Sequence, residues 1–276
     1  MDNIFDRVQE AKQFIIQQNG YTCKQAIVLG TGLGNLAEQI VVEHSIPYAV
    51  IPHFPTSTVE SHLGKLLFGK LDGVPVIVLA GRFHYYEGYS MRALTFPIRV
   101  LKSLDVEVIY MSNVSGSVNP NFQPGSLVLV RDHINTHPEN PLRGINDERL
   151  GPRFPDMLQT YDKALRDSAI KIAKQSDIQL YEGVYLSLQG PNLETPAEYH
   201  YYHTIGADLI GMSTVPEVIV ARHAGIRICV ISVVSNLCYP ISAITETTID
   251  EVIAIANLAE PKLTTLIRGL VTAQHD

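Results

Sequence analysis

The sequence predicts an α/β fold, a single domain with a large mixed central β-sheet flanked by helices. Short apolar runs alternate along the chain with segments of helical periodicity, a pattern typical of a sheet covered by helices. Several runs, such as 226–234, are apolar throughout, which indicates strands buried on both faces. The runs 65–71 and 74–80 are joined only by Asp72-Gly73, which favours a tight antiparallel hairpin. We therefore expect both parallel and antiparallel pairing.

The elements follow in order from these periodicities. The chain opens with an amphipathic helix, since Ile4, Val8, Ala11 and Ile15 keep helical spacing before Asn19-Gly20. The strands expected after it are 25–29, 65–71, 74–80, 107–112, 126–131, 181–188, 208–211 and 226–234. The expected helices are 91–104, 160–175, 196–204, 215–224 and 248–270.

Two helix starts carry strong local signals. Thr195-Pro196-Ala197-Glu198 and Thr214-Val215-Pro216-Glu217 each place a threonine at the N-cap and a glutamate three residues later. The stretch 132–158 is rich in Pro, Asn, Arg and Gly and predicts a long irregular loop, and loops of that length are often functional. Because no linker or repeat interrupts the 276 residues, we expect one domain over 1–276.

Composition excludes several classes of protein. The net charge is −7 and the basic residues are scattered, which argues against a nucleic-acid partner. The three cysteines, Cys23, Cys229 and Cys238, are odd in number and lack metal or redox spacing, which suits a reducing compartment. The start of the chain has no basic, apolar leader and no apolar run reaches membrane length. We expect a cytoplasmic protein without membrane contact.

A polar cluster follows the apolar run 74–80. The segment from Gly81 to Tyr89 contains Arg82, His84 and a carboxylate among aromatic rings. In α/β proteins, ligands bind beyond the carboxyl ends of the strands. A guanidinium can grip phosphate with two donors and an imidazole can add a switchable charge. The cluster predicts an anion site; the structural alternative is a solvated loop whose aromatic rings pack on the core.

Two other segments also fit an anion. Gly30-Thr31-Gly32-Leu33-Gly34 follows a strand, so backbone N–H groups and the Thr31 hydroxyl could approach a phosphate. It matches neither the Walker loop nor the dinucleotide fingerprint. In the segment 211–217, a helix N-terminus would favour phosphate near Ser213. A plain turn and plain helix capping are the respective alternatives.

Amide and carboxylate side chains at further strand ends suit a heterocyclic base. Asn113-Val114-Ser115-Gly116 follows one strand and Ser235-Asn236 another. An asparagine offers both a donor and an acceptor, which fits the edge of a base better than a phosphate. Glu194 could accept from ring and exocyclic N–H groups. Taken singly, a turn-forming asparagine or an exposed glutamate is the simpler interpretation.

Together these segments strongly resemble the trimeric, low-molecular-mass class of purine nucleoside phosphorylases, over nearly the whole chain. The shared stretches are Gly30 to Gly34, Phe54-Pro55 to His62, Gly81 to Tyr89, Arg131 to Asn135, Asn146 to Arg149, Gly190 to Thr195 and Gly211 to His223.

The resemblance assigns roles to individual residues. It implies that phosphate is held by Thr31, Arg82, His84, Ser213 and the Val114 backbone, with His62 close by. It implies that Glu194 and Asn236 bind the purine base by hydrogen bonds. The base site would be lined by Ser115, Gly116 and Leu193. Tyr86 and Met212 would pack on the ribose, and Phe154 would reach in from a neighbouring subunit of a homotrimer. The candidate catalytic residues are Asn236, Glu194 and His84.

The implied reaction is phosphorolysis of the N-glycosidic bond, which gives free purine and ribose 1-phosphate or its 2-deoxy counterpart. The transition state should resemble a sugar oxocarbenium ion, and phosphate serves as nucleophile and counter-charge together. No metal or cofactor is expected, since inorganic phosphate is a co-substrate. An asparagine at position 236, where an aspartate would favour adenine, points to the 6-oxopurines inosine and guanosine.

Some positions depart from the best-known members. Leu193 stands where phenylalanine is frequent, and Cys238-Tyr239-Pro240 makes the 235–247 loop unusual. Ile249, beside Thr248, stands where many relatives carry a histidine at the ribose 5′-hydroxyl, so the residue that reads this hydroxyl stays open.

Three alternative functions remain in view. A methylthioadenosine phosphorylase would suit an isoleucine near the 5′ position, although Asn236 and His62 fit the 6-oxopurine class better. A nucleoside hydrolase needs an activated water, commonly on a metal held by several aspartates, and the sequence has no such aspartate cluster. A non-catalytic nucleoside-binding protein would retain the pocket without turnover.

Overall fold

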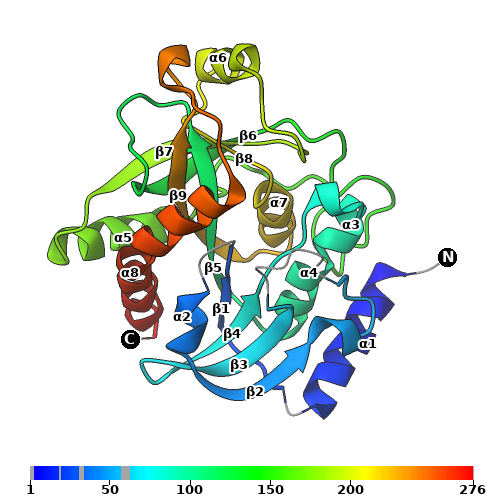
Figure 1. The fold of residues 1–276 in the computed structure, drawn as a ribbon. Helices are drawn as coiled ribbons and strands as arrows, with labels where there is room; N and C mark the ends of the chain where they lie inside the picture. Colours follow the sequence, from blue (N-terminus) through cyan, green and yellow to red (C-terminus); the bar gives the residue numbers. More distant parts are fainter. Residues whose placement is uncertain (1–2, 19, 31–33, 57–62, 276) are drawn as a thin grey trace.

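The computed structural model describes residues 3–18, 20–30, 34–56 and 63–275 (Figure 1). The described residues form a nine-stranded sheet in the order β2-β3-β4-β1-β5-β8-β7-β6-β9. The strands are β1 Gln25–Val28, β2 Val41–Pro47, β3 Lys65–Leu71, β4 Val74–Ala80, β5 Val108–Ser117, β6 Leu127–Asn135, β7 Leu180–Ser187, β8 Leu209–Gly211 and β9 Arg227–Leu237. Parallel pairs such as β1–β4 and antiparallel pairs such as β3–β4 both occur, which confirms the mixed α/β sheet.

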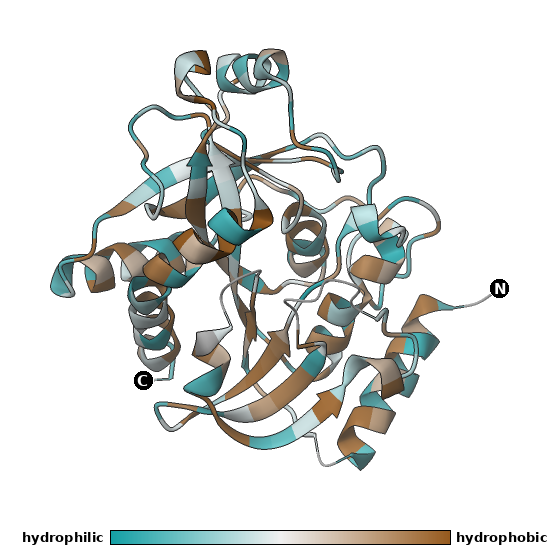
Figure 2. Ribbon diagram, in the orientation of Figure 1, coloured by the Kyte–Doolittle hydropathy of each residue, from teal (hydrophilic) through white to brown (hydrophobic). Residues whose placement is uncertain are grey.

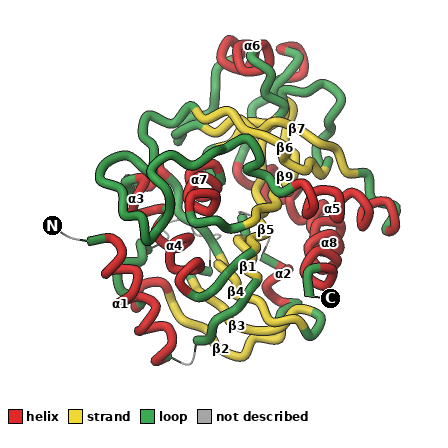
Figure 3. The backbone as a smooth tube through the Cα atoms, turned by 180° about the vertical axis from the view of Figure 1, so that it is seen from behind, coloured by secondary structure: helices red, strands yellow, loops and turns green. Residues whose placement is uncertain are grey.

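Helices cover the two faces of this sheet. They are α1 Ile4–Gln17, α2 Asn35–Glu38, α3 Met91–Leu94, α4 Phe96–Ser103, α5 Lys163–Gln175, α6 Pro196–Thr204, α7 Val215–His223 and α8 Ile249–Ala273. Helices α1, α4 and α7 pack on one another on one side, while α5 and α8 pack together on the other (Figure 3). Among the described residues, no helix is both long and apolar enough to cross a bilayer.

The buried strands explain the continuous apolar runs in the sequence. Ala26 and Val28 of β1 face the core under α1 and α4, whereas Ile27 faces the core under α8. Neighbouring β4 alternates in the same way, and both strands are coloured as hydrophobic in Figure 2. Fully burying one such side chain stabilises the fold by about 1.5–3 kcal/mol, so two covered faces fix the central strands firmly.

Strand β5 joins two parts of the sheet. On one side it continues the open sheet through β1, and on the other it pairs with both β8 and β9. Because β9 also pairs with β6, the strands β5, β8, β7, β6 and β9 close on themselves. β5 and β9 run parallel from Val108↔Arg227 to Ser117↔Leu237. The open sheet and the closed part therefore meet along β5, where the candidate site lies.

Several local predictions are confirmed. The hairpin turns at Asp72 and Gly73, with φ of 51° and 82°, and pairs Leu71 with Val74. Positive φ at both turn residues is the geometry that favours Asp-Gly. The capping box at the start of α6 is present, since the Thr195 hydroxyl accepts from the Glu198 amide at 3.3 Å.

Other boundaries differ from the sequence prediction. Strand β2 was not predicted, because it is an edge strand whose buried residue in the 41–47 run is Ile46 alone. The helix expected over 91–104 is divided at Thr95 into α3 and α4. The helix expected from 160 begins at Lys163, because the Asp162 carboxylate caps it by accepting from the Leu165 amide at 2.9 Å.

Strand β6 runs to Asn135, so residues 132–135 belong to a strand and not to the irregular loop expected over 132–158. The strands β5 and β9 are also longer than predicted. Their ladder continues to Ser117 and Leu237, so Asn113 and Asn236 lie within strands rather than just after them. The register shifts between Ser115 and Gly116, which leaves Ser235 as an extra residue in β9. Such a bulge re-aims neighbouring side chains, and here it brings Asn236 beside Gly116.

Candidate active site

A cavity of about 410 Å³ opens where β5, β8 and β9 meet the segment that follows β4. It contains most of the residues that the sequence singled out. Those that line it are Arg82, His84, Tyr86, Val114, Ser115, Gly116, Leu193, Glu194, Met212, Ser213 and Asn236. Segments far apart in the chain thus converge on one site, as expected for ligands at strand ends.

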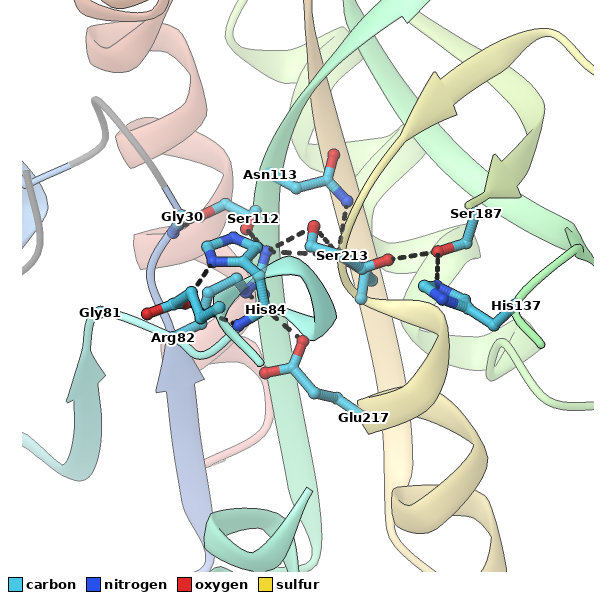
Figure 4. Close-up of polar contacts among 12 residues, drawn as sticks. Gly30, Gly81, Arg82, His84, Ser112, Asn113, His137, Ser187, Ser213 and Glu217 are labelled. Carbon is cyan, nitrogen blue, oxygen red and sulfur yellow. Dashed lines mark hydrogen bonds and ion pairs between the residues drawn. The ribbon is translucent and has the colours of Figure 1, made fainter. Parts of the chain in front are cut away.

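Arg82 is the buried cation of this cavity, with a side chain only 1% exposed. Its Nη1 donates to the Ser112 carbonyl at 2.9 Å, to the Thr214 hydroxyl at 3.2 Å and to the Ser213 hydroxyl at 3.3 Å (Figure 4). Its Nε lies 3.4 Å from a carboxylate oxygen of Glu217. The guanidinium is therefore anchored by β5 and by the start of α7.

The expected capping box at Thr214 is wrong. Thr214 has φ 73° and ψ −55°, its side chain does not cap α7, and its hydroxyl accepts from Asn113 Nδ2 at 2.8 Å. The Val215 amide donates to the Ser213 carbonyl at 2.8 Å, which closes a strained γ-turn. Such strain costs about 1–3 kcal/mol and concentrates at functional sites. Here the turn presents the Ser213 hydroxyl to Arg82.

Glu217 serves as a buried counter-charge instead of a helix cap. Burial raises the pKa of this carboxyl, while the charges of Arg82 and His84 oppose the rise. An isolated carboxylate would be very costly at this depth, so its partner decides its charge. We infer an Arg82–Glu217 ion pair behind the cavity wall.

The Ser213 backbone is held by a second set of contacts. The Ser187 hydroxyl donates to the Ser213 carbonyl at 2.9 Å, and His137 Nε2 lies 2.8 Å from the same hydroxyl oxygen (Figure 4). The only proton of the Ser187 hydroxyl is donated to the Ser213 carbonyl. The His137 imidazole must therefore be the donor in its hydrogen bond with Ser187. Burial lowers the pKa of His137 to about 4, so the ring is neutral and keeps this role at neutral pH.

His84 is oriented by a carboxylate of its own segment. Its Nδ1 lies 2.9 Å from Glu87 Oε1, which also accepts from the His84 backbone amide at 2.8 Å. The ring stacks on Tyr86 with centroids 4.7 Å apart and an interplanar angle of 10°. Burial, and then the charge of Glu87, raise the pKa of Tyr86 to about 12. Tyr86 therefore offers a neutral hydroxyl at neutral pH.

Asn236 and Glu194 lie on the part of the wall suited to a base. The Asn236 carbonyl accepts from the Ser235 hydroxyl at 2.6 Å, and its amide nitrogen donates to Cys238 Sγ at 3.3 Å. A Cβ at Gly116 would lie 2.5 Å from that sulfur, so only glycine leaves room for this arrangement.

Burial raises the pKa of Glu194, and hydrogen bonding by the Tyr199 hydroxyl opposes this rise. Glu194 Oε1 is buried and has no hydrogen-bond partner in the described part of the chain. A buried acceptor without a partner is costly. It is therefore available to a ligand N–H group.

Three of the predicted residues are absent from this description of the cavity, two because they are not described and one because it lies elsewhere. Thr31 and His62 lie outside the described residues. The amide of Gly30, just before Thr31, donates to the Ser112 hydroxyl at 3.4 Å, so the glycine-rich stretch starts beside the residue whose carbonyl anchors Arg82. Phe154 is 86% exposed and lines a separate cavity of about 470 Å³.

Sequence reasoning missed several residues of the site, and four of them bear on its polar groups. Glu217 was interpreted as a helix cap, and Ser235, Cys238 and Tyr199 received no role, although all but Glu217 line the cavity. The motif [ST]-x-x-E carries no information on whether the glutamate faces solvent or a buried arginine. Cys238 resembles any small buried hydrophobe in sequence, so the unusual Cys238-Tyr239-Pro240 stretch did not indicate that the thiol contacts Asn236.

The family comparison agrees with this geometry. Residues 24–272 match the family model described as the phosphorylase superfamily, and the chain belongs to this family.

The related proteins carry a more specific name. Purine nucleoside phosphorylase 1 of Bacillus subtilis is 46% identical over 98% of this chain and 99% of its own length. Purine nucleoside phosphorylase of Mus musculus is 45% identical over 86% of this chain and 84% of its own length. A Schistosoma mansoni purine nucleoside phosphorylase isoform, solved with cytosine and ribose-1-phosphate, superposes with a TM-score of 0.92 at 36% identity and covers 97% of this chain and 96% of its own.

Proposed function

We propose that this chain catalyses the phosphorolysis of purine ribonucleosides and 2′-deoxyribonucleosides, above all those with a 6-oxopurine base, such as inosine and guanosine. The products are the free base and ribose or deoxyribose 1-phosphate. The observation that carries the proposal is that one cavity combines a buried guanidinium with the carboxamide and carboxylate of Asn236 and Glu194. Relatives named purine nucleoside phosphorylase match nearly the whole chain, which supports the same reaction.

Phosphate takes the side of the cavity formed by Arg82, His84 and Ser213, with the amide of Val114 as a further donor. Thr31 and His62 complete this set in the proposal. Because the ion pair with Glu217 and the contacts to Ser112 hold Arg82 in place, the guanidinium need not reorganise during the reaction. Phosphate oriented in this way attacks the anomeric carbon as the glycosidic bond lengthens. The dianion also stabilises the oxocarbenium-like sugar.

The departing base receives the negative charge that leaves the glycosidic bond. In the proposal, the Asn236 amide nitrogen donates to N7, and Glu194 accepts from N1–H and from the 2-amino group of guanine. Ser115, Gly116 and Leu193 line the slot for the ring. One preorganised bond to developing charge contributes about 2.7–4 kcal/mol to transition-state stabilisation. His84, held by Glu87, lies on the phosphate side.

The preference for 6-oxopurines follows from donor and acceptor types. O6 and N7 of hypoxanthine and guanine are both acceptors and match an amide N–H₂ group, whereas the 6-amino group of adenine is a donor. A carboxylate at position 194 accepts from N1–H, which adenine lacks. Rejecting a ligand that leaves buried polar groups unpaired can reach about 10⁴-fold.

The assembly proposed is a homotrimer without a cofactor, acting in the cytoplasm. Phe154 projects from the irregular segment between β6 and α5 with 86% of its surface exposed, which is unfavourable for a phenylalanine in water. Insertion of Phe154 beside Tyr86 and Met212 of a neighbouring subunit would bury this ring and close the ribose side. The oligomer and the ribose site would then form together.

A nucleoside panel tests the function. With saturating phosphate, release of free base is followed for inosine, guanosine, adenosine and xanthosine. We expect inosine and guanosine to exceed adenosine by at least about 100-fold in kcat/KM, following the discrimination of a hydrogen-bonding site. Equal or faster cleavage of adenosine would refute the base assignment. Binding of inosine without turnover would instead identify a nucleoside-binding protein.

A further inference from the structure

The start of α8 forms an apolar part of the cavity wall. Ile249 and Val252 both line the cavity, together with Thr247 and Thr248. Ile249 is 63% exposed, so its side chain is available for contact with a ligand. The segment that follows β9, the strand of Asn236, leads through a 3-10 turn at Ile241–Ala243 into this helix. The wall is therefore continuous with the part of the site that holds the base.

The polar side chains on this wall already have partners. The Thr248 hydroxyl donates to Glu251 Oε2 at 3.0 Å and accepts from the Glu251 amide at 3.3 Å, as a helix cap. The Glu251 carboxylate also accepts from the Thr248 amide at 2.9 Å. The Thr247 hydroxyl donates to the Thr245 carbonyl at 3.3 Å. A ligand hydroxyl that accepts from Thr248 would have to displace a capping contact, which is worth about 1 kcal/mol.

The stereochemistry of a nucleoside directs its 5′ carbon to this wall. In a β-nucleoside the base and C5′ lie on the same face of the sugar ring, and phosphate attacks from the opposite face. Arg82 and Ser213 define the phosphate side. Tyr86 stacks on His84, so its hydroxyl belongs to that side and suits the 2′ and 3′ hydroxyls. The 5′ substituent therefore faces Ile249 and Val252.

Building on the proposed phosphorolysis, we propose that the preferred substrates are 6-oxopurine nucleosides with an apolar 5′ group, namely 5′-deoxy and 5′-alkylthio nucleosides. Asn236 and Glu194 select the base, while Ile249 and Val252 select the 5′ group. In the described part of the chain, the hydroxyls of Thr247 and Thr248 have already given their protons to other acceptors. The wall therefore offers a 5′-hydroxyl little in return for its desolvation. The same wall gains from contact with a methyl or thioether group.

The test compares inosine, 5′-deoxyinosine and 5′-methylthioinosine at saturating phosphate with the unmodified enzyme. A site built to bind a hydroxyl rejects the analogue that lacks it by about 10⁴-fold, whereas an added apolar carbon changes kcat/KM by about 10–200-fold. We expect 5′-deoxyinosine to equal or exceed inosine, and 5′-methylthioinosine to exceed it by about 10-fold or more.

Two outcomes would overturn the inference. One is a kcat/KM for 5′-deoxyinosine about 30-fold or more below that of inosine, which corresponds to about 2 kcal/mol and so to the loss of a hydrogen bond to the 5′-hydroxyl. The other is faster cleavage of 5′-methylthioadenosine than of 5′-methylthioinosine. If none of these nucleosides releases base in the presence of phosphate, the proposed phosphorolysis itself fails, which is distinguishable from both outcomes.

A pair of variants locates the effect on the wall. Ile249→Asn introduces a donor and an acceptor at an exposed helix start, where the substitution is compatible with folding. We expect it to raise the ratio of kcat/KM for inosine over 5′-deoxyinosine by about 10-fold, as one new hydrogen bond allows. Leu258→Asn, on an exposed face of α8 outside the cavity lining, should leave the ratio unchanged. An unchanged ratio in Ile249→Asn would overturn the inference.

Discussion

The substitution Glu217→Gln tests whether a buried ion pair prepares the anion site. The Glu217 carboxylate lies 3.4 Å from Arg82 Nε, and the two side chains are 6% and 1% exposed. Glutamine keeps the volume but removes the charge, which leaves the guanidinium as a buried cation without its counter-charge. Breaking a buried pair costs about 3–5 kcal/mol. Because burial already disfavours the ionised carboxylate, we expect the lower end, about 3 kcal/mol.

Phosphate should restore much of this loss. At about 100 times its Kd, a ligand that binds only the folded state adds about 2.7 kcal/mol to stability. In the variant, the Glu217 charge no longer offsets the charge of Arg82, so phosphate should bind about tenfold more tightly than it binds the unmodified protein. This tighter binding should add about 1.4 kcal/mol more to the free energy of unfolding. Phosphate should therefore stabilise Glu217→Gln more than it stabilises the unmodified protein.

The assay is urea unfolding followed by circular dichroism, since the chain contains no tryptophan for fluorescence. The matched control is Glu182→Gln, which removes a carboxylate 2.6 Å from Arg166 in a pair that is 38% and 22% exposed. That change should cost at most about 1 kcal/mol and show no added phosphate effect. A Glu217→Gln protein as stable as the original, with an equal gain from phosphate, would refute the reasoning.

Three further predictions concern the base and the ribose. Asn236→Asp should lower kcat/KM for inosine by about 100–1,000-fold and raise that for adenosine; a normal inosine rate with no gain on adenosine would count against the assignment. Tyr199→Phe should move the acidic limb of the kcat/KM–pH profile to higher pH, because its hydroxyl lowers the pKa of Glu194, which burial raises. Only the ionised Glu194 carboxylate accepts a hydrogen bond from N1–H of the base, so activity is lost as the pH falls through the pKa of Glu194. An acidic limb that does not move in Tyr199→Phe would contradict this role of Glu194. Phe154→Ala should raise KM for inosine by about 10-fold or more at an unchanged KM for phosphate, whereas a fully active monomer in light scattering would exclude a contribution from a neighbouring subunit.

The sequence predicted those features that depend on local pattern. Continuous apolar runs gave the buried strands, and Asp72-Gly73 gave the hairpin, because the conformations at these positions are set by neighbouring residues and by burial. The order of strands in the sheet was not predictable in this way. The closure of β9 onto both β5 and β6 depends on pairings between segments far apart in the chain.

In the candidate site, too, the sequence predicted what depends on residue type and motif but not what depends on contacts between distant segments. Arg82, Ser213, Glu194 and Asn236 were recognised by residue type and motif, and the structure places them around one cavity. The role of Glu217 was not predictable, because its counter-charge comes from a residue more than a hundred positions earlier. Positive φ at Thr214 also has no sequence signal, since tertiary contacts from Asn113 and Arg82 impose it.

The most direct measurement of the central claim is ³¹P NMR of inosine incubated with the protein and inorganic phosphate. If phosphate in the Arg82 site attacks the anomeric carbon, ribose 1-phosphate accumulates in step with hypoxanthine, and omission of phosphate stops base release. Hypoxanthine released with free ribose, at a rate independent of phosphate, would contradict the account.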